Sequence, residues 1–333
     1  MAIADQIDAL ASESVFSGVV RIDRGDEVVV DRAYGLAQRG YEIPNETDTR
    51  FAIASGVKGM TALAVVSLVE DSTLELTTTA RSILGTDLPL VDDAVTVEQL
   101  LAHRSGIGDY FDEDVEGEIT DYLLPVPVHR LVDTEDYLSV LGGYPTKFAP
   151  DERFSYCNGG FVVLALIAER ASGVPFHELV ARRVCEPAAM QDTAFLRSDE
   201  LPGGTALGYL AADGLRTNVL HLPVRGSGDG GIYTTAADVR AFWEALFAGK
   251  IVAREWVAAM TRPRSDSEDG RRYGLGFWLH GTTDAVMLEG YDAGVSFRSL
   301  HDPVEGVTAT VISNWSNGAW PLVPLLEGTV AQS

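Results

Sequence analysis

The sequence predicts an α/β fold with an inserted all-α region, in which an antiparallel sheet is built from both ends of the chain and flanked by helices. Two observations support this prediction. Runs typical of strands occur near both termini, and runs with helical spacing fill the middle of the chain. We therefore predict a discontinuous α/β domain from residues 1–75 and 205–333, with a helical domain formed by residues 76–204.

The strand predictions come from short apolar runs next to turn residues. Residues 16–35, FSGVVRIDRGDEVVVDRAYG, alternate apolar and polar side chains on either side of Arg24-Gly25-Asp26, which indicates a hairpin. Four more runs follow near the C-terminus, and the last two are separated by the turn residues of 301–306: YGLGFWLHG, AVMLEG, VSFRSLHD and GVTATVISNW.

The helix predictions come from the middle of the chain. Four runs carry apolar residues at helical spacing, several with Gly or Pro at their ends: VTVEQLLAHRS, TEDYLSVLGG, GGFVVLALIAERASG and PFHELVARRV. A fifth run, residues 51–71, reads FAIASGVKGMTALAVVSLVED and is apolar on every face, so we expect a buried central helix.

The buried helix carries a lysine one turn after a serine. Ser55 falls in its first turn and Lys58 three residues later, so the amine lies beside the hydroxyl. Lysine is rare in this chain, with three among 25 basic residues. Burial lowers the pKa of an ammonium, and a neutral amine beside a hydroxyl is a general base that can activate a nucleophile. The serine–lysine spacing also arises by chance, so further motifs are needed.

Tyr156-Cys157-Asn158 is a YxN triplet just before an apolar helix, about a hundred residues after the SxxK pair Ser55 and Lys58. Three more stretches stand in order along the chain: VTVEQLLAHRSGIGDY, CEPAAMQDTAF and GDGGIYTTAADVRAF. In order and spacing, this set resembles the penicillin-recognising serine hydrolases, which include class C β-lactamases, D,D-peptidases, D-aminopeptidases and β-lactamase-like esterases. The resemblance covers about residues 12–320.

The resemblance implies a β-lactamase/transpeptidase-like fold and a role for each motif residue. Ser55 is then the acylated nucleophile, and Lys58 with Tyr156 transfers the proton, in a division that the sequence leaves open. Asn158 holds the lysine and the carbonyl oxygen of the substrate. A nearby lysine can lower the pKa of the tyrosine phenol. His103 matches a family histidine that we interpret as structural, and we expect Cys157 to be a buried filler.

A third family motif, KTG or HxG, precedes an amide of the oxyanion hole, and here the matching region departs from it. Residues 288–299 read LEGYDAGVSFRS, so the triplet is either Glu289-Gly290-Tyr291 or Asp292-Ala293-Gly294. Both begin with an acid where the family has a cation that helps hold a substrate carboxylate. A backbone amide can still complete the hole, but we expect an acid to disfavour β-lactams and to favour neutral or amine-bearing substrates.

Composition excludes several kinds of partner. The formal charge of −24 disfavours nucleic acid and anionic membranes, and no apolar run is long enough for membrane insertion. The first residues show no signal-peptide pattern, and with two cysteines we expect a cytoplasmic protein. No metal or organic cofactor is implied. The acidic residues of DEDVEGEITDYL, residues 112–123, are interpreted as a solvated loop at the mouth of the site.

The sequence thus predicts a serine hydrolase that forms an acyl-enzyme with a small-molecule or short peptide acyl substrate. We expect an esterase or an amidase/peptidase rather than a true β-lactamase. Two alternatives stay open. One is a catalytically silent binding or assembly protein of the same fold, and the other is a D,D-carboxypeptidase or β-lactamase. The sequence leaves the natural substrate, the oligomeric state and any link between acidity and a saline habitat open.

Overall fold

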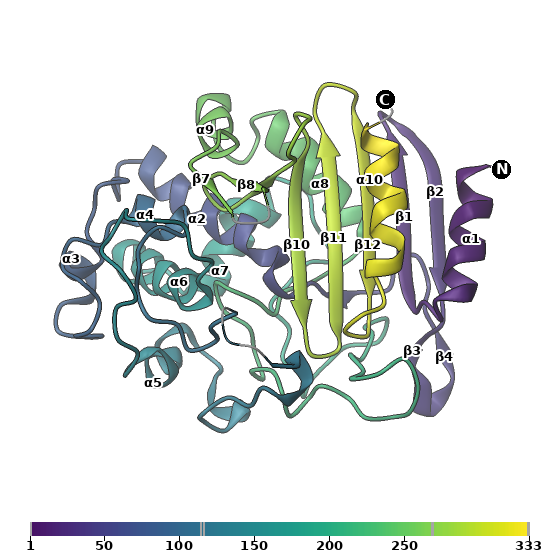
Figure 1. Cartoon of the computed structure of the whole chain (residues 1–333), viewed down its shortest axis with the longest axis horizontal. Coiled ribbons are helices and arrows are strands. Elements are labelled where there is room, and N and C mark those ends of the chain that lie inside the picture. The colour runs from purple at the N-terminus through teal and green to yellow at the C-terminus, as the bar shows by residue number, and fades with distance from the viewer. Residues whose placement is uncertain (1, 114, 116, 268–269, 332–333) are drawn as a thin grey trace.

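The computed structural model describes residues 2–113, 115, 117–267 and 270–331. Within them, the main sheet is antiparallel and has eight strands in the order β2-β1-β12-β11-β10-β9-β8-β7 (Figure 1). Its strands are β1 Gly18–Arg24, β2 Glu27–Tyr34, β7 Ser265–Asp266, β8 Arg272–Tyr273, β9 Trp278–Leu279, β10 Val286–Asp292, β11 Val295–Asp302 and β12 Val307–Ser313. Two small two-stranded sheets pair β3 Leu36–Gln38 with β4 Ile43–Pro44 and β5 Phe51–Ala52 with β6 Tyr233–Thr234.

The α-helices lie at both ends of the chain and through its middle. They are α1 Ile3–Glu13, α2 Lys58–Glu70, α3 Ala80–Leu84, α4 Val97–Leu101, α5 Leu138–Leu141, α6 Asn158–Ser172, α7 Phe176–Val180, α8 Ala236–Phe247, α9 Arg254–Met260 and α10 Val323–Ala331. One π-helical segment, Ala181–Cys185, continues α7. The 3₁₀ segments are Arg39–Tyr41, Ala54–Val57, Ile119–Asp121, Val128–Arg130, Thr134–Tyr137 and Trp320–Leu322.

The predicted sheet from both chain ends is confirmed, because β1 pairs with β12 along its whole length. The N-terminal hairpin also forms as predicted, with Gly25 at φ +55° in its turn. The predicted strand within 273–281 is reduced to β9, Trp278–Leu279, whereas β10 extends beyond the predicted run to Asp292. The helix predicted in 134–143 is mostly a 3₁₀ turn followed by the single turn α5.

Helices cover both faces of the sheet. The two terminal helices α1 and α10 lie on one face, where their apolar side chains pack with Val20, Leu300 and Val311 in one buried cluster (Figure 1). Helix α8 lies on the opposite face and contacts β1 and β12. A much larger apolar cluster continues from that face through α2 and α6, so these two helices form the centre of the molecule.

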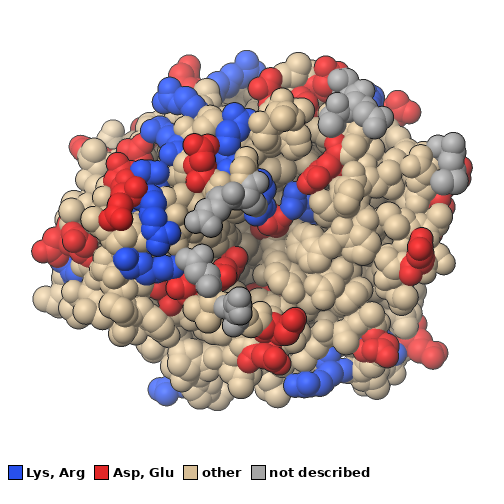
Figure 2. Space-filling view, viewed as in Figure 1, with Lys and Arg blue, Asp and Glu red and all other residues tan. Residues whose placement is uncertain are grey.

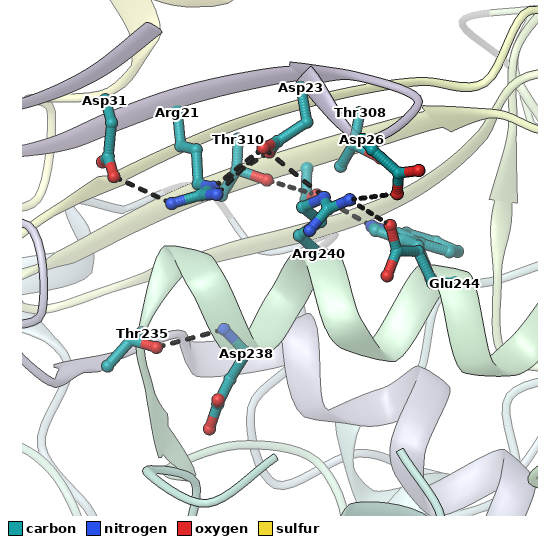
Figure 3. A network of polar contacts seen from close by, with 12 residues as sticks. Arg21, Asp23, Asp26, Asp31, Thr235, Asp238, Arg240, Glu244, Thr308 and Thr310 are labelled. Atoms are coloured by element: carbon teal, nitrogen blue, oxygen red, sulfur yellow. Dashed lines mark hydrogen bonds and ion pairs between the residues drawn. The ribbon is translucent and has the colours of Figure 1, made fainter. Parts of the chain in front are cut away.

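Charged side chains join the N-terminal hairpin to α8 (Figure 3). Asp23 on β1 is buried and lies 2.9 Å from Arg21 and 3.5 Å from Arg240 of α8, measured between oxygen and nitrogen. Arg21 also reaches Asp31 on β2 at 2.8 Å. A buried charge is tolerated only when it is paired, so this network positions the hairpin over α8.

The helices α3 to α7 all fall within residues 76–204, the segment predicted to be helical. The domain boundaries themselves stay a prediction. Within the described residues, none of the helices alone has the length and apolarity of a membrane span. Asn158–Ser172 and Phe176–Cys185 pass such a test only as a pair, by length and composition, across a bend of 86°.

Candidate active site

Ser55 lies in a 3₁₀ turn, Ala54–Val57, which leads directly into α2. The predicted buried helix is confirmed, since Lys58 through Leu68 are buried. The α-helix begins at Lys58, however, and not before Ser55. The preceding residue, Ala54, has φ +44°, a left-handed conformation that costs a non-glycine residue about 1 kcal/mol. The bond from Ile53 N to Ile232 O, at 3.1 Å, holds this turn in place.

Lys58 is buried, with 2% of its surface exposed, and its ammonium has three partners. Its Nζ donates to Ser55 Oγ, Asn158 Oδ1 and the carbonyl oxygen of Asp229, each at 2.8 Å. Burial lowers the pKa of Lys58, against the attraction of four nearby carboxylates, Asp229, Glu113, Asp109 and Asp292. The amide oxygen and the carbonyl can only accept, so the contact with Ser55 is the one that can reverse when Lys58 is neutral.

Asn158 begins α6, and all the polar atoms of its side chain are engaged. Besides the contact of Oδ1 with Lys58, Nδ2 donates to Phe111 O and to Glu113 Oε1, each at 3.0 Å. Asp109 accepts from the backbone amides of Asn158 at 2.6 Å and Gly159 at 2.8 Å, and so caps the helix. Asn158 holds Lys58 as the resemblance implied. Both of its amide hydrogens are already donated to protein groups, so neither is left for the bond to the substrate's carbonyl oxygen that the resemblance also implied.

Tyr156 lies on the other side of Ser55. It lines the same pocket as Ser55, and its ring centre lies 4.9 Å from Lys58 Nζ. Burial raises the pKa of Tyr156 well above its ordinary value, repulsion by Glu113 adds to this effect, and the interaction with Ser55 opposes both only in part. The suggestion that lysine lowers this phenol pKa is therefore wrong, because desolvation of a phenolate outweighs the nearby amine.

His103 has the structural role that we expected. It is buried, and its Nδ1 accepts from the backbone amide of Cys157 at 3.0 Å. Its ring lies 4.3 Å from the ring of Tyr156, measured between centroids, so it supports the first two residues of the YxN triplet. Burial lowers the pKa of His103 well below 6.5, so the imidazole is neutral. Cys157 is a buried free thiol, and burial raises its pKa, as expected for a residue that only fills space in the interior.

The strand β10 runs beside the Ser55 turn. At Gly290, an added Cβ would lie 2.0 Å from Ile53 O and 3.1 Å from Gly56 N, so only glycine permits this approach. Of the two registers considered for the third motif, Glu289-Gly290-Tyr291 therefore lies along the turn. Asp292 ends the strand, and Ala293-Gly294 forms the β10–β11 turn, with Gly294 at φ +74°.

The charge of Glu289 is balanced by arginines, which the sequence argument did not anticipate. Glu289 pairs with Arg298 of β11, its partner in the strand register, and with Arg271 at 3.1 Å. Its repulsion of a substrate carboxylate is therefore weaker than we expected from the sequence. Asp292 has no such arginine among the described ion pairs. Burial raises its pKa to about 7, and repulsion by Asp229 and Glu113 adds to this effect.

Four acidic or phenolic residues of the site received no role from the sequence. Glu113 and Asp109 support Asn158, and Tyr110 donates from its hydroxyl to Asp229 Oδ2. All four contact positions far away in the chain, so no local spacing could reveal them. The glycine-rich stretch 226–231 brings the carbonyl oxygen of Asp229 to Lys58. Residues 114 and 116 of the predicted acidic loop lie outside the described residues.

Two pockets meet at Ser55. One, with a volume of about 60 Å³, is lined by Asn158, Asp229 and Asp292 together with apolar side chains. The other, with a volume of about 330 Å³, is lined by Tyr156, Trp278, Arg271 and Glu289. Figure 2 shows that both acidic and basic side chains surround a hollow at the centre of this face. Among the described residues, no group of three or more His, Cys, Asp or Glu is arranged to hold a metal ion.

Comparison with known proteins agrees with this architecture. The chain is 29% identical over 280 residues to the putative penicillin-binding protein PbpX of Bacillus subtilis, covering 82% of this chain and 65% of that protein. It is 29% identical to esterase EstB of Burkholderia gladioli, covering 88% of this chain and 80% of the esterase. The chain thus spans slightly less than two thirds of the length of PbpX.

Among solved structures, a penicillin-binding protein from Bacillus halodurans superposes with a TM-score of 0.90 and 35% identity. The match covers 97% of this chain and 99% of that protein. The predicted fold class is confirmed by this similarity. The Beta-lactamase family model matches residues 3–325. The chain therefore belongs to the Beta-lactamase family, as its ordered motifs predicted.

Proposed function

We propose that this protein is a serine hydrolase that cleaves an ester or amide carbonyl through an acyl-enzyme on Ser55. The observation that carries the proposal is the buried Lys58, whose Nζ lies 2.8 Å from Ser55 Oγ and is held by two obligate acceptors. Because those two groups can only accept hydrogen bonds, a neutral Lys58 turns its lone pair toward Ser55 and is placed to take its proton. The name of its relative, esterase EstB, supports a hydrolytic activity of this kind.

The directions of the two pKa shifts favour different roles for Lys58 and Tyr156. Lys58, whose pKa is lowered, accepts the proton of Ser55 as the hydroxyl attacks the carbonyl. Tyr156, whose pKa is raised and which stays a phenol, gives its proton to the leaving group. The Lys58 ammonium then restores the phenol, so that the net transfer runs from serine to leaving group, and water afterwards releases the acyl group.

The oxyanion is stabilised by backbone amides in this proposal. Ser55 supplies one amide at the start of α2, where the helix dipole adds positive potential. β10, close to the turn at Gly290, supplies the other. The strand contains Glu289 in place of a lysine or histidine, so we expect esterase or amidase activity to exceed hydrolysis of penicillins.

Intact-mass spectrometry after incubation with a fluorophosphonate, a p-nitrophenyl ester and a penicillin tests the proposal. We expect an adduct of one acyl or phosphonyl group on Ser55 with the first two reagents, and no adduct with Ser55→Ala. Ser67→Ala is a matched control, because Ser67 is a buried serine of α2, the helix that follows the Ser55 turn, and lines neither pocket. If no reagent labels the protein, the alternative of a silent binding protein of this fold is supported. A penicillin adduct that forms as fast as the ester adduct would contradict the expected preference.

A further inference from the structure

Tyr156 lines the pocket of about 330 Å³ beside Ser55. In the proposed mechanism its phenol gives a proton to the leaving group, so the phenol oxygen must lie within hydrogen-bond reach of the departing atom. That oxygen is fixed to a rigid ring, and an error of about 1 Å in a reacting geometry costs on the order of a hundredfold in rate. The contacts that hold the ring of Tyr156 therefore bear on catalysis.

Two neighbouring rings contact the ring of Tyr156. The buried imidazole of His103 lies 4.3 Å away, and the indole of Trp278 lies 5.9 Å away, both measured between centroids. The planes of Trp278 and Tyr156 differ by 10°, so the two rings are stacked, a favoured arrangement of aromatic pairs. Trp278 also lines the same pocket. A shift of Trp278 would therefore change the orientation of the phenol.

The guanidinium of Arg271 lies over the ring of Trp278, with Cζ 4.1 Å from the ring centroid. This distance is well within the range of a cation–π contact. Trp278 belongs to β9, which has two residues and pairs with β8 and with β10 at two positions each. Because so short a strand has few backbone hydrogen bonds to fix it, the contact with Arg271 contributes to the placement of Trp278.

Glu289 holds Arg271 in this place. Its Oε1 accepts from Arg271 Nη1 at 3.1 Å, and its Oε2 accepts from Arg298, the residue opposite it on β11. Arg298 is buried and also donates to Glu327 of α10 at 2.8 Å. Both carboxylate oxygens of Glu289 are thus engaged with arginines of the protein. Charge-assisted hydrogen bonds of this kind are strong and directional, so the main sheet fixes Arg271 over Trp278.

We propose that Glu289, Arg271 and Trp278 are positioning residues that keep the phenol of Tyr156 directed at the leaving group. This inference rests on the proposed acyl-enzyme function of the same site. Glu289 holds Arg271, Arg271 covers Trp278, and the ring of Trp278 keeps the ring of Tyr156 in place. The acid that stands where the resemblance places a cation thus acts through Tyr156, and not on a carboxylate of the substrate.

Acetate esters whose leaving groups differ in pKa test the inference: p-nitrophenyl, p-chlorophenyl and phenyl acetate. A well-placed proton donor makes the rate less dependent on the leaving group, because a poor leaving group then departs as the neutral phenol. We expect the ratio of kcat/KM for phenyl acetate to that for p-nitrophenyl acetate to fall about two- to fivefold in Arg271→Met and about tenfold in Trp278→Leu. These are the fold-changes equivalent to one cation–π contact and one stacked aromatic pair.

Matched variants separate positioning from a general loss of structure. Arg272→Met, at the next residue along the chain, and Trp256→Leu, in the larger apolar cluster, should leave the ratio unchanged, since neither residue lines a pocket at Ser55. Trp278→Phe keeps a ring and should restore most of the ratio. In a Tyr156→Phe background, Arg271→Met should lower the ratio no further, because the group through which it acts is gone.

The outcomes distinguish this inference from the function on which it rests. Equal losses for all three esters in Arg271→Met and Trp278→Leu overturn the inference, as does a further fall of the ratio in the Tyr156→Phe background, while labelling of Ser55 by a fluorophosphonate leaves the hydrolase intact. Absence of both labelling and turnover in the unmodified protein overturns the proposed function itself. If Trp278→Leu does not fold, Arg271→Met, at a partly exposed residue, decides the question.

Discussion

Gly290→Ala tests whether β10 must approach the Ser55 turn as closely as it does. The new Cβ would lie 2.0 Å from Ile53 O, whereas ordinary contacts begin at 3.4 Å, so strand and turn must separate by 1.4 Å. A displacement of about 1 Å in a reacting geometry costs on the order of a hundredfold in rate. Overpacking of this kind also destabilises a fold by about 1–3 kcal/mol.

The assay is kcat/KM for p-nitrophenyl acetate, read beside the midpoint of thermal unfolding. Gly203→Ala is the control, because its added Cβ meets nothing within 4 Å and its φ is not positive. We expect Gly290→Ala to lose activity about a hundredfold at temperatures where it is folded, and Gly203→Ala to match the unmodified protein. Full activity in a folded Gly290→Ala would refute the argument that β10 completes the oxyanion site at this distance.

Three further predictions follow from the site. Lys58→Met should lower kcat about 10²- to 10⁴-fold in the same assay, the usual contribution of a general base, whereas Lys250→Met, at an exposed lysine, should not. Tyr156→Phe should slow hydrolysis of an anilide more than that of a p-nitrophenyl ester, because the ester's leaving group needs less protonation. Tyr41→Phe, at an exposed position, is its control. Equal losses for both substrates would contradict the role of Tyr156 as the proton donor to the leaving group. Burial raises the pKa of Asp109 to about 6 from an ordinary 3.8. Its contribution to stability is thus present below pH 4 and is lost as pH rises through about 6, so the unfolding free energy of the protein should fall by about 3 kcal/mol relative to Asp109→Asn over that range in urea titrations.

The residues that act locally were predictable from the sequence. Ser55 and Lys58 stand one turn apart in a buried run, and the YxN triplet precedes an apolar helix. Spacing and apolarity, together with the ordered family motifs, made these residues the candidates. The hairpin around Gly25 follows from alternation and turn chemistry, which are also local. In contrast, the short strands β7, β8 and β9 have two residues each, so no periodicity could develop in them.

Contacts between distant segments decided the rest. The sequence by itself determined the fold class and the pair Ser55 and Lys58, because helical spacing and burial are properties of one segment. Only the tertiary structure decided that both amide hydrogens of Asn158 are occupied, that arginines pair with Glu289, and that the carbonyl oxygen of Asp229 meets Lys58. Whether a charged group or a hydrogen-bond donor finds a partner inside the protein depends on which segments meet in space. The type of a residue alone does not reveal whether its partner is another residue or a substrate.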